Sequence, residues 1–79
     1  DARMALFDLL GHNAKLAVEV DNTIRKATEP GWRGNRIKRK KIVYKLYEKL
    51  IDKHYGEDAA EEKANEIFGL VERQGDYDV

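Results

Sequence analysis

Apolar residues recur along this chain at spacings of three and four, the period of an amphipathic helix, and no stretch alternates as a strand does. Glycine and proline residues punctuate the pattern at Gly11, Pro30, Gly31, Gly56 and Gly75. We therefore predict four helices, over about 2–10, 13–28, 36–55 and 58–73. The predicted fold class is all-α, a small bundle of three main helices plus a short N-terminal helix, in a single domain over residues 1–79.

The second predicted helix has an inward apolar stripe with offsets of four, four and three. Its members are Leu16, Val20, Ile24 and Ala27, and Ala17 widens it. The charged residues that fall mostly off this stripe are Glu19, Asp21, Arg25 and Lys26.

The third predicted helix has a broad apolar side and a lysine side opposite to it. The apolar side comprises Ile37, Val43, Tyr44, Leu46, Tyr47, Leu50, Ile51 and Tyr55, and the lysine side comprises Lys38, Lys41, Lys45 and Lys49. Ile42 is an exception, because it is an apolar residue on the lysine side. In the flanking helices the residues expected inside are Leu6, Phe7 and Leu10, and then Ala60, Ala64, Ile67, Phe68 and Val71.

The ends of the helices carry recognisable signals. Asn35 is predicted to cap the third helix, and Asp58 with Glu61 resembles a capping box at the start of the fourth. Gly11 suits the left-handed residue that follows a helix, and Asp1 is a candidate cap for the first. Burying the apolar faces only roughly offsets the entropy of ordering so short a chain, so we expect a marginally stable domain, which hints at a partner.

Charge is unevenly distributed, although the formal net charge is zero. Seven of the 15 basic side chains lie in residues 33–45, which contain no acid. From Glu48 onward the chain contains ten acids and four bases. The neutral total argues against a protein whose whole surface binds a polyanion. The basic stretch is either a solvated face or a contact for phosphates or an acidic partner. Its members are Arg33, Arg36, Lys38, Arg39, Lys40, Lys41 and Lys45.

The sequence contains no recognisable motif or spacing of residues that could perform catalysis. His12 and His54 form no metal-binding pair. In the absence of cysteine and serine the common nucleophiles reduce to the threonine hydroxyls of Thr23 and Thr28, which have no base at a recognisable spacing. Residues 31–34 follow a helix rather than a strand and form no phosphate-binding loop. We therefore predict no catalytic, metal or cofactor site.

Two further features concern the location of the protein. The longest apolar run is four residues, Met4 to Phe7, which excludes a membrane span or a signal-peptide core. The absence of cysteine is compatible with the cytoplasm. Because the chain begins at Asp1 rather than methionine, we expect a fragment of a larger protein or a processed chain.

Trp32 lies on a Pro-Gly turn beside basic residues and has two interpretations. It folds back onto the helices and closes the small core, or it projects toward a partner, because tryptophan and arginine dominate interface hot spots.

Several segments together resemble the C-terminal end of the R subunit of type I restriction enzymes. These are Ala-Val-Glu-Val-Asp-Asn-Thr-Ile-Arg at 17–25, Gly-Trp-Arg-Gly-Asn at 31–35, a lysine-rich helix at 37–42, Ile67-Phe68, and the closing Gln74-Gly75-Asp76-Tyr77. The resemblance spans about residues 6–77. Gly75 departs from it, since many relatives carry a larger polar residue there.

The resemblance implies a non-catalytic assembly domain of a bacterial or archaeal cytoplasmic protein. Such a domain docks the ATP-dependent DNA translocase and endonuclease subunit onto the methyltransferase (M) subunit, for cleavage of unmodified DNA. ATP and Mg would belong to other domains of the parent, so no cofactor is expected in this fragment. The candidate partner-binding residues are Trp32, Arg33, Asn35, Lys38, Lys41, Lys45, Lys49, Phe68, Gln74 and Tyr77.

An alternative function is an auxiliary nucleic-acid-binding domain. In that case the basic helix over residues 36–49 would lie along a DNA backbone and bind its phosphates. Aromatic interleaving for base stacking is poor, because Tyr44 and Tyr47 are expected on the core side. No membrane partner is expected.

Overall fold

A computed structural model of the chain describes residues 2–53 and 55–78. It has four α-helices, α1 (Ala2–Leu9), α2 (Ala14–Ala27), α3 (Arg36–Lys53) and α4 (Glu57–Arg73), and two short 3-10 helices, η1 (Trp32–Gly34) and η2 (Gly75–Tyr77). No strand occurs within these described residues. The prediction of an all-α bundle with three main helices and a short leading helix is therefore confirmed.

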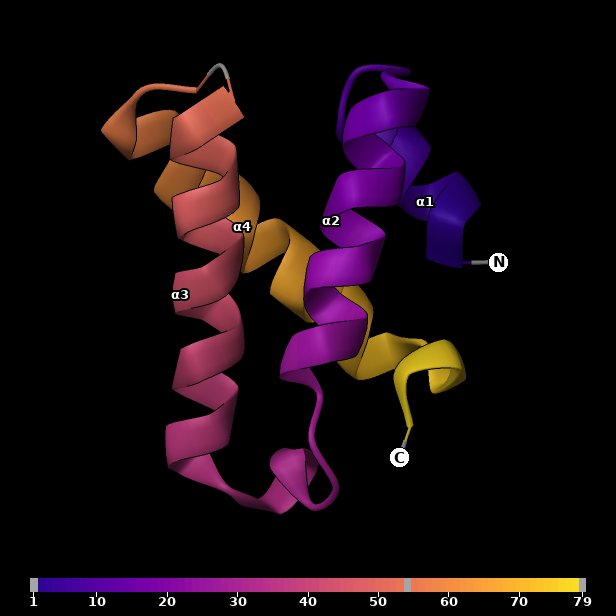
Figure 1. Ribbon diagram of the computed structural model, residues 1–79, viewed down its shortest axis with the longest axis vertical. Helices are drawn as coiled ribbons and strands as arrows, with labels where there is room; N and C mark the ends of the chain where they lie inside the picture. Colours follow the sequence, from indigo (N-terminus) through magenta and orange to yellow (C-terminus); the bar gives the residue numbers. More distant parts are fainter. Residues whose placement is uncertain (1, 54, 79) are drawn as a thin grey trace.

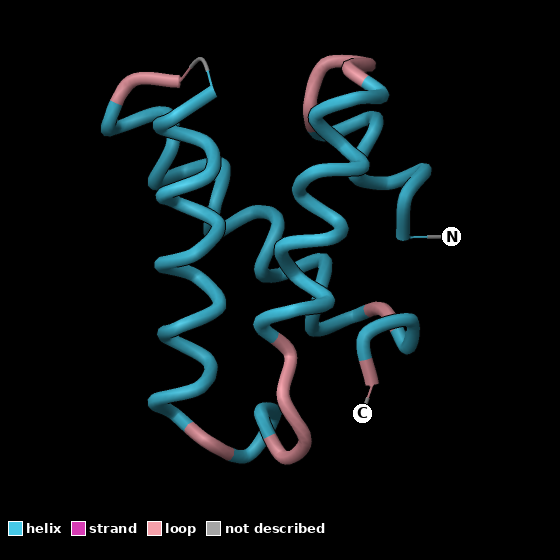
Figure 2. The backbone as a smooth tube through the Cα atoms, in the orientation of Figure 1, coloured by secondary structure: helices cyan, strands magenta, loops and turns pink. Residues whose placement is uncertain are grey.

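Helices α2 and α3 run antiparallel, joined by the loop that contains η1, and α4 crosses behind both (Figure 1). Helix α3 packs against α2 and α4, and α1 packs against the same two helices from the other side. Helix accounts for most of the described backbone (Figure 2). The start of α1 contacts η2 near the other end of the described chain, because the backbone N–H of Ala2 donates to Oδ2 of Asp76 at 3.1 Å.

A single apolar cluster fills the space between the helices. Every residue of the predicted α2 stripe is buried, as are Leu6 and Leu10 in the first segment. In α4 the predicted stripe is also buried, with two differences: Phe68 is only partly covered, and Leu70 belongs to the core.

The predicted orientation of α3 was wrong in part. Ile42, which had been assigned to the lysine side, is completely buried together with Leu46 and Leu50. Ile37 and Tyr44, which had been assigned to the core side, are 80% and 60% exposed. The apolar residues of α3 extend around more of its circumference than α2 and α4 cover, so the buried stripe follows one edge of that broad side.

Asparagine side chains cap two of the helices. Oδ1 of Asn35 accepts hydrogen bonds from the backbone N–H groups of Ile37 (3.0 Å) and Lys38 (3.1 Å), which confirms the predicted cap of α3. Oδ1 of Asn13 accepts from the N–H of Leu16 at 3.0 Å at the start of α2. Each cap satisfies backbone donors that have no partner within the helix.

The predicted capping box of α4 was wrong. The helix begins at Glu57 after Gly56, which makes no side-chain cap, and Asp58 lies in the first turn. The two acids of that turn still favour the helix, because negative charge near the N-terminus complements the macrodipole.

The end of α1 follows the prediction for Gly11, whose φ is +68°. His12 also has a positive φ of +64°, which is uncommon for a residue with a side chain. Its N–H donates to the carbonyl of Phe7 at 2.8 Å, and its ring stacks on that of Phe7 with centroids 5.0 Å apart. These contacts hold the tight connection into α2.

The last helical residue of α3 is Lys53, two residues before the predicted end at Tyr55. Gly56 therefore precedes α4 and does not terminate α3 directly. The predictions for Asp1 as a cap and for His54 lie outside the described residues.

Candidate functional site

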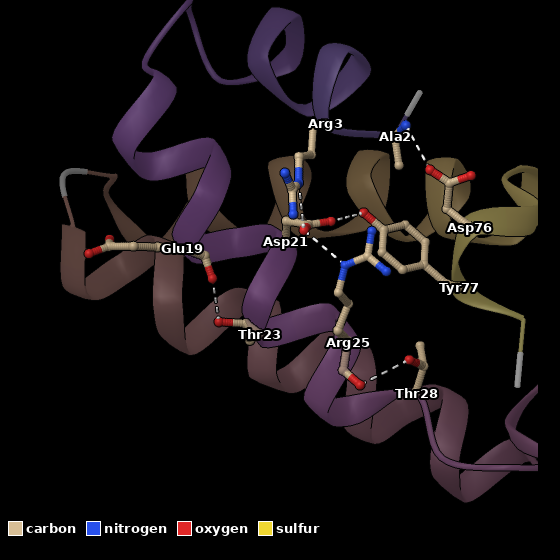
Figure 3. A network of polar contacts seen from close by, with 9 residues as sticks. All are labelled: Ala2, Arg3, Glu19, Asp21, Thr23, Arg25, Thr28, Asp76 and Tyr77. Atoms are coloured by element: carbon tan, nitrogen blue, oxygen red, sulfur yellow. Dashed lines mark hydrogen bonds and ion pairs between the residues drawn. The ribbon is translucent and has the colours of Figure 1, made fainter.

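A buried carboxylate, Asp21, lies at the junction of α1, α2 and the C-terminal tail (Figure 3). Oδ1 accepts a hydrogen bond from the Tyr77 hydroxyl at 2.6 Å. Oδ2 accepts from Nε of Arg25 at 2.9 Å and from Nε of Arg3 at 3.3 Å. The expectation that Asp21 lies off the buried face was wrong, because its side chain is buried. Its three hydrogen-bond donors compensate the cost of burying a charge.

These contacts fix the protonation of the pair. Burial alone would raise the pKa of Asp21, but the hydrogen bonds from Tyr77 and Arg25 outweigh it and hold that pKa below its usual range. Burial and the hydrogen bond to Asp21 raise the pKa of Tyr77. The pair therefore stays an ionised carboxylate and a neutral phenol near neutral pH. Because Asp21 is inaccessible, it cannot act as a base on a substrate.

Trp32 folds back onto the helices and is 1% exposed, so the structure agrees with the first of its two interpretations. Its Nε1 donates to the backbone carbonyl of Tyr77 at 3.2 Å, and its ring meets that of Phe68 edge-on at 6.2 Å. Gly31 has a φ of +81°, the left-handed conformation that lets the chain turn into η1.

Arg33 holds the C-terminal end of α4. Its guanidinium lies 4.5 Å from the ring of Trp32 and donates to the carbonyls of Glu72 at 2.8 Å and Gln74 at 3.2 Å. Its Nε also donates to Oδ1 of Asp78 at 2.6 Å. These carbonyls have no partner within the helix, so Arg33 supplies a cap from a distant part of the chain.

Three of the five segments on which the sequence resemblance rests meet around Tyr77. Asp21 comes from residues 17–25, Trp32 and Arg33 come from residues 31–35, and Gln74 and Tyr77 come from the tail. Asp21 was not expected in a site, although its position was a signal: it lies four residues after Ala17 and three before Ile24, at the edge of the apolar stripe.

The first half of the lysine side lies against the loop that follows α2. Nζ of Lys41 is 3.1 Å from Glu29, and Nζ of Lys38 is 3.7 Å from it and donates to the carbonyl of Pro30 at 3.0 Å. The hydrogen bond and the charge of Lys41 are the main reasons why the pKa of Glu29 is lowered. These two lysines stabilise a turn of the protein itself.

The second half of the lysine side borders a shallow depression next to α2. Lys45 lies there 3.9 Å from Glu48, and Lys49 is half-buried beside Thr23. The four predicted lysines thus lie along the seam between α2 and α3.

Arg39 crosses from α3 to α4. It forms an ion pair with Glu72 at 2.6 Å, and its guanidinium lies 5.1 Å from the ring of Phe68. The partly covered Phe68 is thereby held at the edge of the core, with one side toward solvent.

An apolar groove of about 530 Å³ runs along the seam between α3 and α4. Val43, Tyr44 and Tyr47 form the apolar part of its α3 wall, and its α4 wall comprises Glu61, Ala64, Asn65 and Phe68. Most of these residues had been predicted to lie in the core. They form a groove because the outer edge of the broad apolar side of α3 extends beyond what α4 covers.

The turn at residues 31–34 packs against the rest of the fold. Gly31 and Gly34 flank a turn whose tryptophan is buried and whose Arg33 is bound to α4, so no free cradle of backbone N–H groups is formed. No group of three or more metal-ligating side chains was found among the residues that the structure describes. The same residues include no helix that is long and apolar enough to cross a membrane.

Comparison of the chain with protein-family models, curated proteins and solved structures finds no match.

Proposed function

We propose that this chain is a non-catalytic assembly domain of an R subunit of a type I restriction enzyme. In this proposal it docks the ATP-dependent translocase and endonuclease subunit onto the methyltransferase subunit, in the cytoplasm of a bacterium or archaeon. The supporting observation is the convergence at Tyr77. Residues of three of the segments on which the resemblance rests, 17–25, 31–35 and 74–77, are joined there by hydrogen bonds.

The way these residues are used supports a structural role for them. The carboxylate of Asp21 and the guanidinium of Arg33 are engaged by partners within the protein. Trp32 and Tyr77 are buried, so they support docking by holding the tail and α4 in place and offer almost no surface of their own. Partner contacts would then fall on neighbouring exposed residues.

The ion pairs of the basic stretch favour assembly over nucleic-acid binding. Arg33, Lys38, Arg39, Lys41 and Lys45 each lie within 4.0 Å of an acid of the same chain. A lysine or arginine that is already paired gains less from a phosphate. Titration of duplex DNA at two salt concentrations tests the alternative, because each phosphate contact would contribute a slope of about −0.9 in log affinity against log salt.

The proposal is tested in the full-length parent protein. Deletion of residues 57–79 removes α4 and the tail, and we expect it to abolish association with the methyltransferase subunit while ATPase activity is retained. Retained ATPase activity shows that the other domains remain folded. A matched parent that carries the exposed substitution Lys26→Ala should associate normally. A truncated parent that still binds the methyltransferase with normal affinity would overturn the proposal.

A further inference from the structure

The groove between α3 and α4 has a charged end that the rest of the fold does not use. Arg36 and Lys40, one helical turn apart, line it on the α3 side. The other five bases of residues 33–45 have an acidic partner within 4.0 Å. Arg36 and Lys40 form no ion pair with any residue in the described ranges. Basic residues near the start of a helix also oppose its macrodipole, so helix stability does not explain them.

Tyr44, which lines the groove, also belongs to an exposed apolar stripe on α3. Ile37, Tyr44 and Ile51 are spaced by seven residues and are 80%, 60% and 37% exposed. A spacing of seven places them on one face of the helix. An exposed apolar surface next to a groove is typical of a protein-binding site, and tyrosine and arginine are frequent at the centres of such sites.

We propose that this groove binds an amphipathic helix of a partner protein. The apolar side chains of that helix would fill the space between Tyr44 and Phe68, and an aspartate or glutamate at one end would pair with Arg36 and Lys40. This inference rests on the proposed assembly function and adds to it the chemistry of the partner. Binding of an amphipathic helix in an apolar groove is a recurring mode of recognition.

The walls of the groove favour this occupant over DNA. Val43, Tyr44 and Phe68 present apolar surface, which a phosphate backbone cannot use, and Glu61 of the α4 wall would repel a phosphate. With only Arg36 and Lys40 unpaired at the rim, few phosphates would be neutralised.

A second copy of the chain also fits less well. Its acidic helix would be α4, but the exposed large apolar residues found among the described positions lie on α1, α2 and α3. A second α4 would therefore bring acids to the rim without apolar side chains for the groove.

The test uses the isotopically labelled chain and three synthetic helical peptides in NMR titrations. The first peptide has a leucine and phenylalanine face with glutamates at one end. The second has lysines in place of the glutamates, and the third has serines in place of the apolar face. We expect the first to shift the amide signals of Val43, Tyr44, Ala64 and Phe68. The second should bind about tenfold more weakly, and the third should not bind.

Charge reversal tests the rim directly. The double substitution Arg36→Glu with Lys40→Glu should invert the preference, so that the lysine peptide binds better than the glutamate peptide. The matched control is Lys15→Glu with Lys26→Glu, which changes the charge equally at exposed positions of α2 and should leave the preference unchanged. Both variants should keep the wild-type helical circular dichroism, because all four side chains are exposed.

Several outcomes would overturn the inference. These are equal binding of the glutamate and lysine peptides, no change at the groove amides, stronger shifts of the same amides by duplex DNA, and self-association that buries Tyr44.

In the parent protein, the charge reversal at Arg36 and Lys40 should weaken association with the methyltransferase subunit about tenfold. If deletion of residues 57–79 abolishes association but this reversal does not alter it, the groove inference fails and the assembly function stands. If the deletion leaves association intact, the assembly function fails and the peptide titrations alone decide the groove.

Discussion

The hydroxyl of Tyr77 donates to a carboxylate oxygen of Asp21 at 2.6 Å across 56 positions of sequence. Both side chains are buried, so this hydrogen bond fastens the final turn of the chain to the middle of α2. Arg25 contributes to the same contact, because its guanidinium lies 5.2 Å from the Tyr77 ring while it binds Asp21. The tail is therefore part of the folded unit.

Removal of the Tyr77 hydroxyl should be costly. In Tyr77→Phe the ring remains but Asp21 loses a donor in a buried place, so we expect the free energy of unfolding to fall by about 1–3 kcal/mol. Urea denaturation followed by circular dichroism measures the change. Tyr44→Phe is the control, because that ring is largely exposed and its substitution should leave stability unchanged. Equal stability of the two variants would contradict a role for this hydrogen bond.

The stability of the protein should depend on the charge of Asp21. Its pKa is lowered in the folded state, so the unfolded chain binds the proton more readily. The stabilisation is fully present above the unfolded pKa of about 3.9 and is lost as the pH falls through the lower folded value. Asp21→Asn should therefore be less stable than wild type at pH 7, and the difference should shrink on acidification.

Urea midpoints measured from neutral to acidic pH test this dependence. The control is Asp8→Asn, which removes a mostly exposed carboxylate of α1 and should track the wild type across the range. A stability difference between wild type and Asp21→Asn that stays constant with pH would show that packing, not charge, makes Asp21 important.

The sequence predicted the helices because their apolar period is strong and glycine or proline interrupts it near each end. The prediction for α2 was correct because the surface that its two neighbouring helices cover is as wide as its apolar stripe. For α3 the apolar side was wider than the contact, and only the placement of α2 and α4 selects the edge that is buried. Ile42 was therefore placed on the wrong side, and Tyr44 was assigned to the core.

The candidate site was predicted less completely. Trp32 was a candidate because of its Pro-Gly turn and Tyr77 because of the closing motif, but periodicity alone could not show that they touch. A buried charge such as Asp21 is recognised only when its partners are known, and Arg3 and Tyr77 lie far from it in sequence. The groove depends on the distance between α3 and α4. The pattern of residues within one helix does not predict that distance.

Trp32 provides a direct readout of its own burial, since it is the only tryptophan in the chain. The native protein should show blue-shifted emission that acrylamide quenches weakly, and unfolding should shift the emission to the red. Trp32→Phe keeps an aromatic ring but loses the hydrogen bond to the Tyr77 carbonyl, so stability should fall by about 1–3 kcal/mol. Native emission typical of a water-exposed indole would contradict the buried position.

Arg33 should not tolerate replacement by lysine. Lysine keeps the charge but lacks the planar fork that reaches two carbonyls and Asp78 together, so we expect a loss of about 1–2 kcal/mol. Amide hydrogen exchange should become faster in the last turn of α4 and in η2. Arg36→Lys is the matched control, since no described acid lies within ion-pair distance of Arg36, and it should change neither stability nor exchange. Unaltered exchange in Arg33→Lys would rule out this distant cap.

The start of α4 offers a stabilising substitution. Gly56 has φ −72° and ψ 170°, which any residue adopts, and a Cβ there would meet no atom within 4 Å. Gly56→Ser adds a side-chain cap and reduces the freedom of the unfolded chain, so we expect a gain of about 0.5–1 kcal/mol. That corresponds to a rise of roughly 2–8 °C in Tm for a domain of this size. Gly31→Ser, the matched control at φ +81°, should instead lose about 1 kcal/mol, because a side chain is strained in the left-handed region. Calorimetry of the two variants separates the effects, and a lower Tm for Gly56→Ser would show that this residue needs the freedom of glycine where α4 begins.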